Sequence, residues 1–120
     1  MTKQRIGRSM GSLRRLLLTV AALVTIVPVA RSEDATVKID NFTFNPPQLI
    51  VKAGTTVTWR NEDDIPHAIA SAERKFKSKA LDTEDRYSYT FTEPGNYAYF
   101  CSLHPHMTGT IVVQSKTASN

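Results

Sequence analysis

The stretch that most constrains the fold of this chain is 97–107, where an expected β-strand leads directly into a cluster of metal-binding side chains. Side chains alternate along a strand with a period of two, so Tyr97, Tyr99 and Cys101 share one face. Cys101 is the only cysteine in the sequence, and the loop after it adds His104 and Met107. A fold that buries this strand face therefore brings a thiol, an imidazole and a thioether to the end of a sheet.

These side chains predict a copper site. Thiolate, imidazole and thioether are soft or borderline ligands, which suit a metal that cycles between a cuprous and a cupric state. A second imidazole would complete a trigonal site of two histidines and one cysteine with a weak axial methionine. His67 lies in a loop-like segment far upstream, whereas His106 is expected to point to solvent. We therefore expect one copper ion per chain, held by His67, Cys101, His104 and Met107.

The rest of the chain predicts an all-β domain. Short apolar or alternating runs separated by Pro/Gly turns favour an antiparallel β-sandwich or barrel, and no convincing amphipathic helix is present. A slip in the alternation near Asp40-Asn41 suggests a bulge or bend. Segment 71–85 fits either a short helical turn or an irregular strand. The expected strands are 35–44, 48–52, 55–60, 68–70, 86–92, 97–101 and 110–113.

Residues 1–32 have the three parts of a secretory signal peptide: a basic start, an apolar run at Leu16–Val29 and a small-x-small cleavage site at 30–32. The apolar run has 14 residues, fewer than the ~20 that a membrane-spanning helix needs. The alternative is a retained membrane anchor. We expect a bacterial-type leader, export to the periplasm and one mature domain at 33–120, with 117–120 as a frayed tail. Arg14-Arg15 leaves the general and twin-arginine export routes open.

The formal charge of +4 comes from the leader, which holds six of the 15 basic residues and none of the 11 acidic ones. The mature part therefore has nine basic and eleven acidic residues, a net charge of −2. This balance removes the electrostatic argument for nucleic-acid binding. Glu62-Asp63-Asp64 and the basic cluster Arg74–Lys79 either steer a partner or only keep the domain soluble.

Four motifs give the sequence a resemblance to the cupredoxins, the type 1 blue copper proteins, and within them to the amicyanin group; they are Thr56–Asn61, Pro66-His67, Pro94-Gly95-x-Tyr97 and Tyr99–Met107. The resemblance implies a Greek-key β-sandwich of seven or eight strands with copper at one end. It makes His67, Cys101 and His104 the strong ligands and Met107 the long axial one. The edge of His104 would be the electron port, within an apolar patch of Leu103, Pro105 and Pro66. The chain departs from the pattern at Ala68, where many relatives have a side chain that ties two ligand loops together.

These observations lead to three hypotheses for function. The first is a monomeric single-electron carrier, not an enzyme, with no membrane span in its mature form. Its partners would be redox proteins, and the amicyanin resemblance suggests a periplasmic dehydrogenase and a c-type cytochrome. The second is a copper chaperone or copper store that uses the same ligands. The third is a zinc-binding or metal-free interaction module, because cysteine and histidine also hold zinc.

Overall fold

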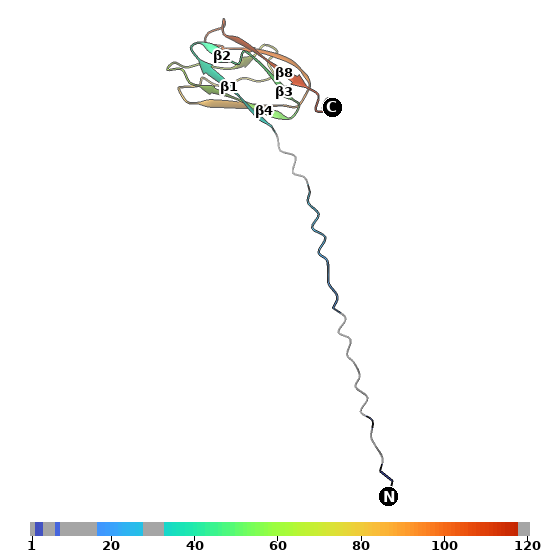
Figure 1. The fold of residues 1–120 in the computed structure, drawn as a ribbon. Coiled ribbons are helices and arrows are strands. Elements are labelled where there is room, and N and C mark those ends of the chain that lie inside the picture. Colours follow the sequence, from blue (N-terminus) through green and yellow to red (C-terminus); the bar gives the residue numbers. More distant parts are fainter. Residues whose placement is uncertain (1, 4–6, 8–16, 28–32, 118–120) are drawn as a thin grey trace.

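The computed structural model describes residues 2–3, 7, 17–27 and 33–117 (Figure 1). Much of the predicted signal peptide, including the cleavage triplet 30–32, lies outside these residues, as do 118–120 of the expected tail. Within 17–27 the large apolar side chains are exposed; Leu17 is 88% exposed and Leu23 also 88%. Among the described residues, no helix has the length and apolar character to cross a membrane. The signal peptide and the boundary at 32/33 remain predictions.

Two four-stranded sheets pack face to face to form the domain. One sheet has the order β2-β1-β4-β6 and the other β3-β8-β7-β5. The described residues contain eight strands and no helix, which confirms the predicted all-β sandwich (Figure 1). The strands are β1 (Asp34–Asp40), β2 (Thr43–Asn45), β3 (Gln48–Lys52), β4 (Thr55–Asn61), β5 (Ala70–Ser71), β6 (Arg86–Phe91), β7 (Gly95–Phe100) and β8 (Thr108–Gln114).

The sheets are mixed: the expected antiparallel pairing is found in four of the six strand pairs, and the other two are parallel. β1 pairs in parallel with β4, and β3 pairs in parallel with β8, whereas the other pairs are antiparallel. The chain crosses between the sheets after β2, β3, β4, β5 and β6. Neighbouring strands within a sheet are therefore often not consecutive in the chain, and two of the six pairs are parallel. A period-two pattern shows which side chains face inward but carries no information about strand direction.

The predicted bend at Asp40-Asn41 is a tight hairpin turn between β1 and β2. Asp40 pairs with Thr43, so Asn41 and Phe42 are the two loop residues. Both have positive φ, at 48° and 56°. Two positive φ values are characteristic of the type I′ hairpin, in which Asn and Gly are the favoured residues. A bulky phenylalanine in this region is a conformational outlier, so something outside the turn must stabilise it.

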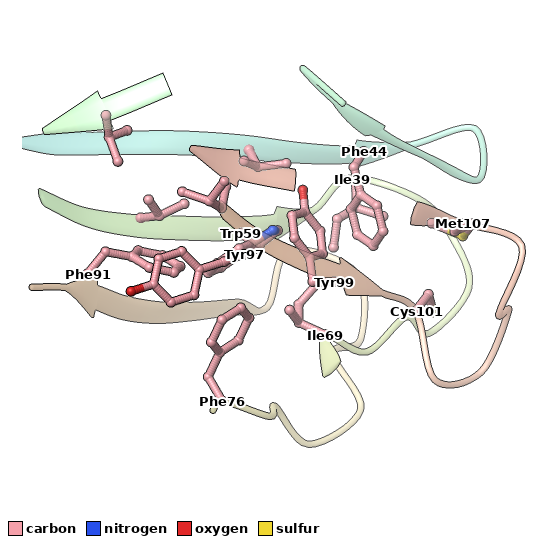
Figure 2. Packing of buried hydrophobic residues seen from close by; sticks show 14 of the residues in the cluster. Ile39, Phe44, Trp59, Ile69, Phe76, Phe91, Tyr97, Tyr99, Cys101 and Met107 are labelled. Atoms are coloured by element: carbon pink, nitrogen blue, oxygen red, sulfur yellow. The ribbon is translucent and has the colours of Figure 1, made fainter. Parts of the chain in front are cut away.

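Trp59 on β4 lies at the centre of an aromatic core between the sheets (Figure 2). The alternation predicted for this strand is confirmed, since Val57 and Trp59 are both fully buried. Aromatic pairs add to the stability that area burial alone provides, and edge-to-face arrangements are preferred. The rings whose centroids lie within 6.3 Å of the Trp59 ring are those of Tyr99, Phe76, Tyr87 and Phe91.

Segment 72–85, for which the sequence left two alternatives, is irregular and runs back along the segment that begins at His67. Ser78 N donates to Ile69 O at 2.8 Å, and the Ser78 hydroxyl accepts from Ile69 N at 2.8 Å. Phe76, Ser78 and Leu81 are buried, whereas the basic side chains of the Arg74–Lys79 cluster are exposed. The segment therefore covers one side of the sandwich without belonging to either sheet.

Gly109→Ala should destabilise the domain. Gly109 on β8 is paired with Tyr99 on β7, and an added β-carbon would overlap the Tyr99 ring. Overpacking in a close-packed core costs about 1–3 kcal/mol. Chemical denaturation should show a loss of this size for Gly109→Ala and almost none for the exposed control Thr108→Ala. Equal stability of the two variants would contradict the packing described here.

Tyr99→Phe should make the domain less sensitive to alkaline pH. Burial raises the pKa of Tyr99 to about 12, whereas an unfolded tyrosine ionises near 10. The stability that depends on the protonated hydroxyl is complete below pH ~10 and is lost as pH rises toward the folded pKa. From pH 8 to pH 11 the wild type should therefore lose more of its unfolding free energy than the variant. Parallel pH profiles of the two proteins would show that Tyr99 does not contribute.

Candidate metal centre

Cys101 is placed by β7, whose inward face continues one residue beyond the end of the strand. Tyr97, Tyr99 and Cys101 are all buried, as the period of two predicted, and Cys101 has no exposed surface. Three backbone hydrogen bonds then close the loop: Cys101 N to Met107 O at 3.0 Å, His104 N to Cys101 O at 3.2 Å, and Met107 N to His104 O at 2.9 Å. The loop is therefore held by its own main chain, and its side chains do not need to fix it.

His67 approaches from the segment before β5. Its backbone pairs with Leu81, with Leu81 N donating to His67 O and His67 N donating to Leu81 O at 3.1 Å. The imidazole is fully buried. The predicted strand at 68–70 begins only at Ala70, so His67 lies in an extended connection and not within a sheet.

Three of the four predicted ligands converge. The Cys101 sulfur lies 3.7 Å from His67 Nδ1 and 3.6 Å from His104 Nδ1. All three atoms lie within 4.8 Å of one another. Metal bonds of about 2.0–2.3 Å to nitrogen and sulfur place two donors on a shared ion roughly 3.5 Å apart. The three donor atoms therefore fit a common metal ion.

Met107 and His106 differ in position although they are neighbours. Met107 is buried at the same end of the sandwich as Cys101 (Figure 2). His106 is exposed, as expected. Met107 is therefore a buried thioether at the end of the sandwich that holds Cys101, and a thioether is among the donors that copper favours.

The sequence analysis expected no hydrogen bond from the side chain at Ala68, and the structure shows that the backbone supplies one. Ala68 N lies 3.4 Å from the Cys101 sulfur and donates to it. Donors to a ligand sulfur tune a metal site and fix the ligand in place. The two ligand loops are thus connected through a main-chain group, which no side-chain pattern reveals.

Asp63 contacts the metal centre from behind His67. Its Oδ2 lies 2.7 Å from His67 Nε2, and the carboxylate also accepts hydrogen bonds from the backbone of Asn41 and Phe42. Burial by itself would raise the pKa of Asp63, but hydrogen bonds from Phe42 N, His67 and Asn41 N outweigh it and lower that pKa. The Asp63 side chain is thus hydrogen-bonded inside the protein, so neither alternative given for the run 62–64, steering or solubility, describes this residue.

Phe42 is a part of the site that the sequence analysis treated only as an apolar strand position. Its ring meets the His67 ring edge to face, with centroids 5.6 Å apart, and the His104 ring at 5.2 Å. Phe42 is 51% exposed and Leu103 is 50% exposed, so both also face solvent. The only sequence signal was the slip in the alternation near Asp40-Asn41, which marks a turn but not its neighbours.

Comparison with known proteins agrees with this geometry. The family described as copper binding proteins of the plastocyanin/azurin type matches residues 32–114. The chain belongs to this family. Its fold and its donor set are those expected of a cupredoxin, and copper is the cofactor of the family.

Individual relatives support the assignment. Amicyanin of Paracoccus denitrificans is 40% identical over 83 residues, which are 65% of this chain and 63% of that protein. Amicyanin-alpha of Methylorubrum extorquens is 33% identical over 99 residues, covering 78% of this chain and 83% of the relative. A purple cupredoxin from Nitrosopumilus maritimus superimposes with a TM-score of 0.64 at 37% identity, covering 68% of this chain and 100% of that one.

Proposed function

We propose that this protein is an exported single-electron carrier with one copper ion bound by His67 Nδ1, Cys101 Sγ, His104 Nδ1 and the Met107 thioether. The observation that carries the proposal is the convergence of three donor atoms within 4.8 Å at a buried position. A carrier needs such a preformed site, because ligands that hardly move allow the electron to arrive and leave with little rearrangement.

The chain prepares each ligand for the metal. When bound, copper supplies the one-electron couple. Cys101 must bind as thiolate and the histidines as neutral imidazoles, so metal uptake releases protons. The Asp63 carboxylate beside His67 Nε2 keeps a proton on that nitrogen and leaves the Nδ1 lone pair facing the sulfur. The Ala68 N–H directed at the sulfur stabilises negative charge there.

The surface around His104 fits the part of an electron port. His104 is half-buried, whereas Cys101 and His67 have no exposed surface, so this imidazole is the ligand nearest to a docked protein. The Phe42 ring lies against the His104 ring, and Leu103 precedes His104 in the chain; Phe42 is 51% exposed and Leu103 50%. Redox partners meet through small, transient interfaces, which an apolar patch of this kind can form.

The site favours a carrier over the other functions. No ligand position is left for a substrate when two imidazoles, a thiolate and a thioether are bound, which argues against an enzyme. The complete burial of Cys101 and His67 disfavours the fast metal exchange that a copper chaperone needs. Export through the leader at 1–32 would place the carrier in the periplasm, where a dehydrogenase could supply electrons and a c-type cytochrome could accept them.

Cys101→Ser should abolish the intense visible colour of the cupric protein, because that colour comes from charge transfer between thiolate and copper. The measurement is an absorption spectrum of the purified mature domain after copper loading. Ser102→Ala changes the exposed neighbour and should keep the colour. A serine variant that remains coloured would show that Cys101 is not the ligand.

Met107→Gln should lower the reduction potential, because an oxygen donor favours cupric copper over cuprous copper. Protein voltammetry measures this shift directly. His106→Gln introduces the same side chain at an exposed position one residue away and should leave the potential unchanged. If both variants match the wild type, the thioether does not contribute to the site.

A further inference from the structure

We propose that Asp63 is a positioning residue that clamps the hairpin turn Asn41-Phe42 and the His67 ring to each other, so that Phe42 covers both histidine ligands. The inference rests on the proposed copper site but concerns a different interaction. It assigns a role to a carboxylate and a phenyl ring that are not ligands.

The first observation is that the carboxylate of Asp63 makes three hydrogen bonds. Oδ1 accepts from Asn41 N at 2.7 Å, and Oδ2 accepts from Phe42 N at 3.0 Å and pairs with His67 Nε2 at 2.7 Å. Oδ2 is thus shared between the turn and the ligand. A displacement of either one must change the geometry of the other.

The second observation is that the turn needs such an anchor. Asn41 and Phe42 both have positive φ, and a phenylalanine keeps that strained conformation only where its surroundings impose it. Both backbone N–H groups of the turn point to the same carboxylate. Hydrogen bonds to a charged acceptor are stronger than those to a neutral one, so the carboxylate can offset the strain of the turn.

The third observation is what the strained turn achieves. It holds the Phe42 ring edge to face against His67 and His104, at interplanar angles of 88° and 84°. One phenyl ring therefore lies over both imidazoles while half of it faces solvent. A flexible turn at this position would open the ligand rings to water.

Asp63 is itself fixed by the loop that it belongs to. Its N–H donates to Asn61 Oδ1 at 3.0 Å, and its carbonyl accepts from the Thr83 hydroxyl at 2.7 Å. Asn61 is fully buried and also donates to Ile65 O and Leu81 O, at 2.8 and 2.9 Å. The carboxylate is therefore held from the core side and can position the turn.

The decisive variant is Asp63→Asn, since an amide NH2 cannot accept from Phe42 N or from His67 Nε2–H. At least one of the two turn amides, that of Asn41 or that of Phe42, should exchange at least about tenfold faster, which equals ~1.4 kcal/mol, because the single amide oxygen cannot take both oxygen positions of the carboxylate. Hydrogen exchange by NMR on the cuprous protein reads this out. The reduction potential should also rise, because an imidazole without a carboxylate partner is less basic and stabilises cupric copper less.

Two controls separate the clamp from its alternatives. Asp64→Asn removes the same charge from the exposed neighbour and should match the wild type in both measurements. Phe42→Gly removes the ring but leaves the backbone bonds, so the turn amides and the His67 Nε2–H should stay protected while His104 becomes more exposed. If Phe42→Gly loses that protection as fully as Asp63→Asn does, the ring and not the carboxylate positions His67.

The proposal is overturned if Asp63→Asn keeps both the exchange rates and the potential of the wild type. Failure of the copper-carrier function has a different signature. In that case the wild type shows no reversible couple, while exchange of the Asn41 and Phe42 amides in the metal-free protein still tests the clamp.

Discussion

The metal centre depends on two ligand loops that the pairing of β5 with β7 brings together, since Ala70, three residues after His67, pairs with Phe100, the residue before Cys101. One loop closes on itself through the hydrogen bond from Cys101 N to Met107 O. The other contains His67 and is held by its backbone pairing with Leu81. The β5–β7 pairing and the packing around it set the Cys101 sulfur 3.6–3.7 Å from two imidazole nitrogens. A buried thiol in contact with one buried and one half-buried imidazole is costly to assemble, so the rigid sandwich must hold them there.

Two interactions fix these donors. A backbone N–H from Ala68 reaches the sulfur and connects the His67 loop to the Cys101 loop, and within the His67 loop the Asp63 carboxylate reaches the far nitrogen of His67. The first favours the thiolate and the second favours the tautomer whose Nδ1 lone pair is free. Together they prepare the ligands before any metal arrives, which is consistent with a site whose geometry changes little between oxidation states.

The charged runs of the sequence contain both internal and exposed side chains. In the acidic run 62–64, Asp63 is buried and hydrogen-bonded to His67, and Glu62 lies within salt-bridge distance of Lys38 and Arg60. Asp64 is the exposed member of this run. In the basic cluster, Lys75 pairs with Glu73 and lies over the Tyr97 ring. The remaining cations of the cluster are exposed on segment 72–85.

The sequence by itself determined the features that depend on near neighbours. The alternation in 55–60 and 97–101 gave the inward faces of β4 and β7, and the spacing Cys101-x2-His104-x2-Met107 placed the sulfur and one imidazole in a single loop. Only the tertiary structure decided the parallel pairings, the distance of His67 from the sulfur, and the contacts of Asp63 and Phe42 with the site. The contact of Phe42 with Asp63, that of His67 with the sulfur and the pairing of β3 with β8 join residues 21, 34 and 62 positions apart, and a period-two pattern specifies a strand's face but not its partner.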